Sequence, residues 1–368
     1  MSASKNCRLL YLVGGLGAGG LERQLCLVLQ GVHRELYRPE LVVWSFRSDH
    51  TFVPSVQKLG VPLHSFSNGM SANQKLLLFR RLVRRIKPEV VHSYSNYTNF
   101  AAWWATLATN AIAVGSQQSD FIYEKRTSGP LLGRLSARWP SRQICNSFAA
   151  ADAVRHSRTI FAPKCLSVVR NGIDLDSFGM VPLSTTGQIR ILGVGSLIPL
   201  KRWDRLLKVA VTLKERNFDF LVQIVGAGPL RETLEKQKEE MGMGNHVQFL
   251  GHSDEIPHLL SDATFLVHTS DTEGCPNAVL EAMACGRAVV ATDAGDVPSI
   301  VEDGQTGFVV KRGDDATLVE RVAMLIKDRE LCRKMGEAGR VKAEREFGLD
   351  RLVSETLAAY RAAGWRDS

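Results

Sequence analysis

Short apolar runs alternate with amphipathic stretches along most of this chain. Five runs, LLYLV, ELVVWS, VVHS, IAVG and RQIC, fall between residues 9 and 145. Six more, RILGVG, LVQIVG, VQFLG, TFLVH, AVVAT and GFVV, fall between residues 190 and 310. Strands that alternate with helices in this way form parallel sheets with helices on both faces. Because the rhythm occurs twice, the sequence predicts an α/β protein with two doubly wound, Rossmann-like domains.

The boundary between the two domains is expected within residues 169–188. The segment VRNGIDLDSFGMVPLSTTGQ contains an Asn-Gly turn, Pro182 and a Ser/Thr/Gly tract, all of which interrupt the strand and helix pattern. The length of 368 residues suits two domains of about 150 to 200 residues each. The last 40 residues, rich in Arg, Glu and Ala, predict two or three terminal helices.

Composition restricts the class of protein. Hydrophobic residues make up 45% of the chain and charged residues 23%, as in globular proteins. The seven cysteines form no Cys-x-x-Cys or Cys/His metal pattern, which favours a reducing compartment and argues against structural zinc. No secretory h-region precedes the first strand, so we expect a cytoplasmic protein.

The uncharged segment 90–119 contains several Asn and Thr residues, which favours a buried helix followed by a strand over a membrane span.

Positive charge is concentrated in the first half of the chain. Residues 1–180 contain 22 Lys and Arg against 10 Asp and Glu, a net charge of +12, whereas residues 181–368 carry −4. Such a field attracts an anionic acceptor, a membrane surface or nucleic acid. The chain has no nucleic-acid-binding signature, so nucleic acid is not an expected partner.

The densest basic stretch is KLLLFRRLVRRIK, residues 75–87, which has helical spacing of apolar and basic residues. A surface helix with its apolar stripe on the core is the favoured interpretation. A helix that lies on an anionic bilayer is the alternative, so peripheral contact with the inner face of the membrane stays open.

A glycine-rich loop follows the first predicted strand. Gly15, Gly17 and Gly20 fit the G-x-G-x-x-G pattern of dinucleotide-binding folds. The second strand, ELVVWSF, lacks the acid at its end that would hold a ribose diol, which argues against a nicotinamide-dependent dehydrogenase. Two interpretations remain: a loop that approaches a phosphate at a helix N-terminus, or a tight turn that packs strand on helix.

The segment DTEGCPNAVLEAMACG, residues 271–286, carries the strongest chemical signal. We expect a helix with Pro276 at its first position and Gly286 at its end. Glu273 would lie in the preceding loop and Glu281 about one turn inside the helix. Helical side chains project toward the N-terminus, so both carboxylates can reach a ligand docked there. A solvent-facing Glu281 is the alternative.

The start of this helix also offers free backbone amides, at Asn277, Ala278 and Val279, with the positive end of the helix dipole. Amides suit a diphosphate and carboxylates suit pairs of hydroxyl groups. The combination predicts a nucleotide-sugar site.

EGCPNAVLEAMACG resembles the E-x7-E segment of the family 4 retaining glycosyltransferases of GT-B fold. Seven further stretches resemble this family in chain order: GLGAGGLERQL, RRIKPEVVHSYS, ICNSFAAADAV, VVRNGIDLDSF, VGSLIPLKRWDRLL, IVGAGPLRETLE and VQFLGHSDEI. The resemblance implies an acceptor-side domain over residues 1–180 and a donor-binding domain over 181–348, facing each other across a cleft. It also implies that a C-terminal helix at about 349–368 packs back on the first domain.

The resemblance also implies roles for individual residues. Glu273 would contact the donor sugar, Glu281 the ribose, and Lys201 the diphosphate, where its charge stabilises the leaving group. Glu273 and Lys201 form the expected catalytic set together with Gln117. The remaining expected donor-binding residues are Gly19, Gly20, Ser196, Gly226, Cys275, Pro276, Asn277 and Ala278.

Two positions depart from the family pattern. Ser196 stands where the family usually has Arg, and Arg202 or Arg205 is a candidate replacement for that cation. Gln117 stands where the family often has His; its amide can donate a hydrogen bond but cannot act as acid or base. His92, at the end of the fourth strand, is either an acceptor-side residue or a packed histidine.

The resemblance implies metal-independent transfer, with retention of configuration, of a hexose-type sugar from a nucleoside diphosphate, expected to be UDP. The acceptor would be a hydroxyl of a glycan or a lipid-linked molecule in polysaccharide or glycoconjugate biosynthesis. No cofactor is expected besides this co-substrate, and Asp314-Asp315 is typical of a helix cap rather than a metal loop. Three alternatives stay open: a UDP-sugar 2-epimerase-type isomerase on the same fold, the dehydrogenase, and a non-catalytic sugar-binding subunit.

Overall fold

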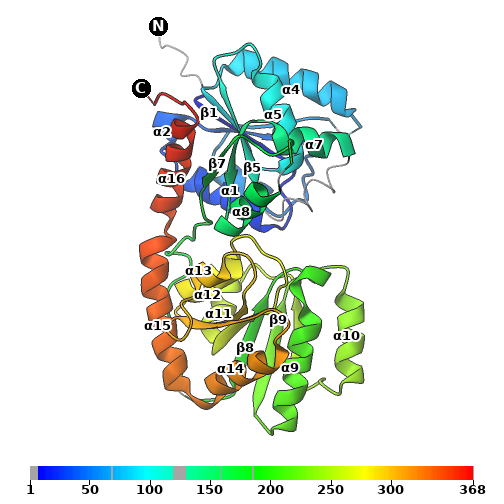
Figure 1. Cartoon of the computed structure of the whole chain (residues 1–368), viewed down its shortest axis with the longest axis vertical. Coiled ribbons are helices and arrows are strands. Elements are labelled where there is room, and N and C mark those ends of the chain that lie inside the picture. Colours follow the sequence, from blue (N-terminus) through cyan, green and yellow to red (C-terminus); the bar gives the residue numbers. More distant parts are fainter. Residues whose placement is uncertain (1–6, 68, 119–129, 158, 185, 368) are drawn as a thin grey trace. The chain divides into compact units, whose positions relative to one another are not determined.

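The computed structural model describes residues 7–67, 69–118, 130–157, 159–184 and 186–367. The chain forms two compact units, one of Met1–Gly172 with Leu349–Ser368 and one of Ile173–Gly348 (Figure 1). Each unit is built around one parallel sheet, as the double rhythm of apolar runs predicted.

The first unit contains a seven-stranded parallel sheet with strand order β3-β2-β1-β4-β5-β6-β7. The strands are β1 (Leu9–Val13), β2 (Glu40–Val43), β3 (Leu63–Ser65), β4 (Val90–Ser93), β5 (Ile112–Gln117), β6 (Arg142–Cys145) and β7 (Cys165–Val168). The helices are α1 (Gly20–Gly31), α2 (Arg34–Tyr37), α3 (Val53–Lys58), α4 (Ala72–Ile86), η1 (Asn96–Thr98), α5 (Asn99–Thr106), α7 (Pro130–Arg138), α8 (Phe148–His156) and α16 (Leu349–Ala362).

The central strand β1 shows why strands of this sheet are continuous apolar runs in the sequence. Leu9, Tyr11 and Val13 belong to a core that also contains residues of α1 and α16. The intervening Leu10 and Leu12 pack with buried residues of α4 and α5 on the opposite face. A strand covered by helices on both faces needs apolar side chains at every position.

The second unit contains a six-stranded parallel sheet with strand order β10-β9-β8-β11-β12-β13. The strands are β8 (Ile189–Val194), β9 (Phe220–Val225), β10 (Val247–Gly251), β11 (Phe265–His268), β12 (Ala288–Thr292) and β13 (Gly307–Val310). The helices are η2 (Pro199–Lys201), α9 (Trp203–Glu215), α10 (Arg231–Glu240), α11 (Ile256–Asp262), α12 (Asn277–Ala284), α13 (Val297–Ile300), α14 (Asp315–Lys327) and α15 (Arg329–Glu346). The buried strand β11 alternates in the same way: Phe265 and Val267 face one core and Leu266 the other.

Two strands, β3 and β7, were not predicted from the sequence. Both lie at edges of the first sheet, and none of their residues is fully buried. Edge strands with little burial lack the apolar run on which the prediction depended. The predicted strand at residues 40–45 is also shorter, because β2 ends at Val43.

Residues 75–86 of the basic stretch lie in α4, and Lys87 is the C-cap of this helix. Phe79 and Val83 are buried in the core, whereas Arg81, Arg84 and Arg85 are exposed. The interpretation as a surface helix with an apolar stripe on the core is therefore confirmed. The uncharged segment 90–119 supplies β4, η1, α5 and β5, and no described helix is both long and apolar enough to cross a bilayer.

The end of the chain returns to the first unit through α16, drawn in red in Figure 1. Leu352, Leu357 and Tyr360 share the core that contains α1. Beyond the helix, the indole of Trp365 donates a 2.7 Å hydrogen bond to Glu89. Residues 349–367 are thus an integral part of this unit.

Candidate functional site

The connection between β11 and α12 places the two glutamates singled out in the sequence. The strand ends at His268, and a loop over residues 269–276 leads to the helix, which begins at Asn277. Pro276 is the N-cap and not, as predicted, the first helical residue, because its extended ψ of 114° leaves it outside the helix. Its carbonyl accepts the first bond of the helix, from the Leu280 amide.

The predicted end of α12 is confirmed. The helix stops at Ala284, and Gly286 has a φ of +69°, the left-handed conformation that glycine adopts without strain. Glu281 is only 1% exposed, because α12 packs against α15 and the sheet. The solvent-facing interpretation of Glu281 is therefore wrong.

Glu273 contacts two nitrogen-bearing side chains. Its Oε1 atom accepts a 2.5 Å hydrogen bond from Lys201 Nζ and lies 3.0 Å from His268 Nε2. Burial acts to raise the pKa of Glu273, but the charge of Lys201 and the contact with His268 outweigh it and hold the pKa well below its usual value. Glu273 is therefore ionised at neutral pH.

The backbone beside Lys201 is tied to the loop that carries Glu273. The Asp271 amide donates to the Leu200 carbonyl at 2.9 Å. The Thr269 hydroxyl lies 2.9 Å from the Lys201 carbonyl and 3.2 Å from the Arg202 carbonyl. The hydrogen bond between the side chains of Lys201 and Glu273 is thus one of several contacts between the turn that carries Lys201 and the loop that carries Glu273.

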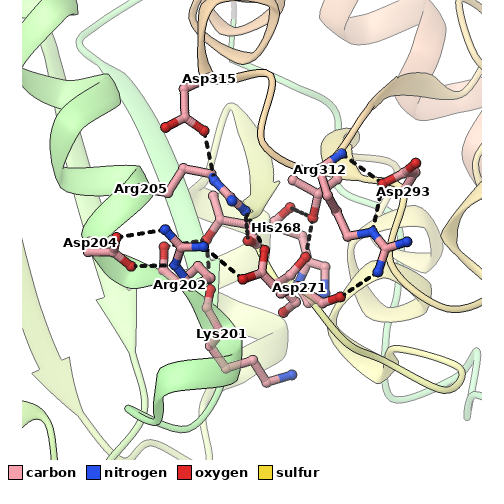
Figure 2. A network of polar contacts seen from close by, with 12 residues as sticks. Lys201, Arg202, Asp204, Arg205, His268, Asp271, Asp293, Arg312 and Asp315 are labelled. Carbon is pink, nitrogen blue, oxygen red and sulfur yellow. Dashed lines mark hydrogen bonds and ion pairs between the residues drawn. The ribbon is translucent and has the colours of Figure 1, made fainter. Parts of the chain in front are cut away.

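Charged side chains strengthen this contact (Figure 2). The Asp271 carboxylate accepts from Arg202 at 2.7 Å and from Arg205 at 3.1 Å. Arg202 also pairs with Asp204, and Arg205 with Asp315. Each arginine therefore contacts two carboxylates. The ammonium of Lys201, which lies in the same turn, points away from this network in Figure 2.

The network extends to the loops after β12 and β13. Arg312 donates to the Asp271 carbonyl at 2.9 Å and pairs with Asp293 at 3.0 Å. Nearby, the Asp314 carboxylate accepts from the Thr317 amide at the start of α14, so the predicted helix cap is confirmed. Four loops at the carboxyl edge of the sheet, which is where ligands bind in such sheets, are joined in one polar framework.

Gly226 and Ser196 lie at the neighbouring ends of β9 and β8. A Cβ atom at Gly226 would lie 2.0 Å from the Gly195 carbonyl oxygen, so backbone packing alone requires glycine there. Ser196 accepts from the Trp203 indole through its carbonyl. Cys275, two residues after Glu273, is buried.

The other predicted site residues belong to the first unit. Gly19 is the N-cap of α1, and Gly20 is its first residue. A Cβ atom at Gly19 would lie 2.2 Å from a carboxylate oxygen of Glu22, so this acid covers the start of the helix. Gln117, at the end of β5, is fully buried, and its Oε1 accepts from Asn96 at 3.0 Å.

His92 is a packed histidine. Its ring nitrogens contact Tyr360 Oη at 2.7 Å and Ser116 Oγ at 2.9 Å. Burial lowers its pKa to about 3, so the ring is neutral at physiological pH. The interpretation of His92 as an acceptor-side residue finds no support in these contacts.

Two residues of the site were not predicted, His268 and Asp271. His268 is the last residue of the buried strand β11 and Asp271 lies three residues beyond it, and this position at a strand end was a signal available in the sequence. Within the described ranges, no group of three or more His, Cys, Asp or Glu residues is arranged to hold a metal ion.

Comparison with known families gives two matches. The family model described as "Glycosyl transferases group 1" matches residues 181–342. The model described as "Glycosyltransferase Family 4" matches residues 18–177. The two matched regions follow each other with a gap of only a few residues.

Curated relatives match over part of their length. The putative glycosyltransferase EpsD of Bacillus subtilis is 35% identical over 162 residues, which is 44% of this chain and 42% of that protein. A GDP-mannose-dependent alpha-(1-6)-phosphatidylinositol monomannoside mannosyltransferase of Mycolicibacterium smegmatis is 32% identical over 228 residues, 55% of this chain and 60% of that protein. This chain thus spans less than two thirds of either relative.

Solved structures match over nearly the whole chain. Anabaena HepE in complex with UDP-glucose has a TM-score of 0.81 at 20% identity, covering 96% of this chain and 99% of that one. Sucrose-phosphate synthase of Thermosynechococcus elongatus has a TM-score of 0.79 at 16% identity, covering 96% and 98%. These likenesses establish a shared fold of two Rossmann-like domains.

Proposed function

This chain belongs to the group 1, family 4 glycosyltransferases of GT-B fold, and on that premise we propose that it transfers a hexose-type sugar from a nucleoside diphosphate to a hydroxyl group, with retention of configuration. The observation that supports this most is the contact of Lys201 with Glu273 at the carboxyl edge of the second sheet. A cation for phosphate and an ionised acid for hydroxyl groups meet there at one point.

In this proposal the donor lies against the start of α12. The ammonium of Lys201 and the backbone amides of residues 277–279, at the start of α12, bind the diphosphate. The Glu273 carboxylate accepts hydrogen bonds from sugar hydroxyls, and Glu281 accepts from the ribose. Gly19, Gly20 and Gln117 of the first unit complete the proposed set.

The proposed reaction needs no protein acid or base. The bond between the anomeric carbon and the phosphate oxygen breaks, and the acceptor oxygen bonds to the same face of that carbon. The acceptor proton passes to the departing phosphate oxygen. Lys201 offsets the charge that develops on the leaving group, and the other residues orient the donor. We propose that no metal ion takes part.

UDP is the proposed nucleotide, and the acceptor is a glycan or a lipid-linked molecule. A structural neighbour is known in complex with UDP-glucose, although one relative is named for dependence on GDP-mannose. The nucleotide is therefore the first property to test.

A thermal-shift screen tests the donor. UDP and GDP forms of glucose, N-acetylglucosamine and mannose are compared, because a ligand at 100 times its Kd stabilises a protein by about 2.7 kcal/mol. We expect UDP-sugars to raise the melting temperature of the wild type and of Lys208→Ala, an exposed control on α9, but not of Lys201→Ala. A rise with GDP-sugars only would correct the nucleotide, and an equal rise in Lys201→Ala would contradict the site.

We also propose that the exposed, basic face of α4, whose apolar stripe packs on the core, contacts an anionic membrane surface. Arg81, Arg84 and Arg85 are exposed on it, beside Leu77, which is also exposed. Sedimentation with phosphatidylglycerol vesicles should carry down the wild type more than a triple Arg→Gln variant at these positions. Equal sedimentation of both proteins, or equal binding to phosphatidylcholine vesicles, would contradict this contact.

A further inference from the structure

His268 approaches the same carboxylate oxygen as Lys201 but from a different kind of support. It is the last residue of β11 and pairs with Ala291 of β12 in the middle of the sheet. Its side chain is 3% exposed. A residue on a central strand is held more precisely than a long lysine side chain on a turn.

The Nε2 atom of His268 is buried and, in the part of the chain that the structure describes, makes no aligned hydrogen bond. It nevertheless lies 3.0 Å from Glu273 Oε1, so only the angle is unfavourable. A buried polar nitrogen without a partner is costly. A small rotation of the Glu273 carboxylate would satisfy it.

We propose that His268 is a positioning residue for Glu273. Its Nε2–H group holds Oε1 in place when Lys201 is drawn to the donor diphosphate, and Oε2 is thereby left to accept from a sugar hydroxyl. Lys201 has a long, flexible side chain and, in this proposal, contacts both the Glu273 carboxylate and the donor diphosphate. His268 lies on a central strand of the sheet and contacts the carboxylate. This inference rests on the proposed function of the site.

Two amide variants separate positioning from packing. In His268→Gln the side-chain nitrogen takes about the place of Nε2, whereas in His268→Asn it takes about the place of Nδ1 and falls short of Glu273. The variants share polarity and differ in reach. His258→Asn, on the exposed side of α11, is the matched control.

The measurement is kcat and donor KM for sugar transfer, with UDP release as the readout. We expect His268→Gln to keep kcat within about threefold of the wild type, and His268→Asn to lose about tenfold or more, as on removing a hydrogen bond to a charged group. Donor KM should change by less than about threefold in both. His258→Asn should match the wild type.

Equal kcat values for the Gln and Asn variants, or a loss confined to KM, would overturn the inference. A poorly folded Asn variant is replaced by His268→Leu, which also removes the donor and carries the same expected loss. Wild-type turnover tests the proposed function separately: an inactive wild type rejects that function and this inference with it, whereas an active wild type with unaffected variants rejects the inference alone.

Discussion

Arg205, a buried residue of α9, places its Nη1 atom 3.1 Å from the Asp271 carboxylate in the loop before α12. Asp271 thereby links α9, the helix that follows the turn carrying Lys201, to the loop that carries Glu273. Arg205 also donates to the Thr269 carbonyl at 2.8 Å. The separation of the two proposed catalytic side chains is therefore set by residues that need not touch a ligand.

The first prediction concerns this acid. Asp271→Ala should lower the free energy of unfolding by about 1 to 3 kcal/mol, because a buried guanidinium loses one of its two carboxylates while partial exposure of Asp271 reduces the cost. Asp204→Ala is the control, since Asp204 pairs with the less buried Arg202 and its loss should cost less than about 1 kcal/mol. Urea unfolding measures both; an equal or larger effect for Asp204 would refute this anchoring role.

A second prediction concerns the close approach of two strand ends. Gly226→Ala should destabilise the protein by about 2 to 4 kcal/mol, since the new Cβ would collide with the Gly195 carbonyl oxygen. Gly304 has a positive φ of +76°, as Gly226 has one of +147°, but open space surrounds Gly304. Gly304→Ala should therefore cost only about 1 kcal/mol. Thermal unfolding compares them, and similar losses in both variants would show that the contact with Gly195 is not tight.

A third prediction concerns pH and His92. Its pKa is lowered by burial to about 3 from 6.5, so the folded state binds fewer protons than the unfolded state between these values. Stability from this group is complete above pH 6.5 and is lost as the pH falls toward 3. Between pH 7 and pH 5 the wild type should lose about 2 kcal/mol that His92→Gln does not lose. Parallel pH profiles of the two proteins would contradict the neutral, packed state.

The sequence predicted those parts of the fold in which the type of a residue follows directly from its own burial or backbone conformation. Strand β11 is apolar because both of its faces are covered, and Gly286 ends α12 because its backbone needs a positive φ. The edge strand β3 escaped prediction because its side chains are only partly buried.

The site was predicted less completely, for a physical reason. The types of Lys201 and Glu273 pointed to phosphate and hydroxyl binding, but their direct contact depends on how two loops meet in space. From the sequence, Arg202 and Arg205 are candidates for the cation that is missing at Ser196, but in the structure each of them pairs with two carboxylates. A residue type indicates what a side chain can bind, whereas only the packing shows which partner it has.

The most direct measurement is the rate of UDP release from a UDP-sugar with acceptor for Lys201→Ala beside Lys208→Ala. Loss of one group that stabilises developing charge costs about 2.7 to 4 kcal/mol, so we predict a rate at least about 100-fold lower for Lys201→Ala and an unchanged rate for Lys208→Ala. Without ligand, Lys208→Ala should keep the wild-type melting temperature, whereas Lys201→Ala should lower it, because buried Glu273 loses the charge that holds its pKa down. Wild-type turnover by Lys201→Ala would contradict the proposal that the diphosphate is bound beside Glu273.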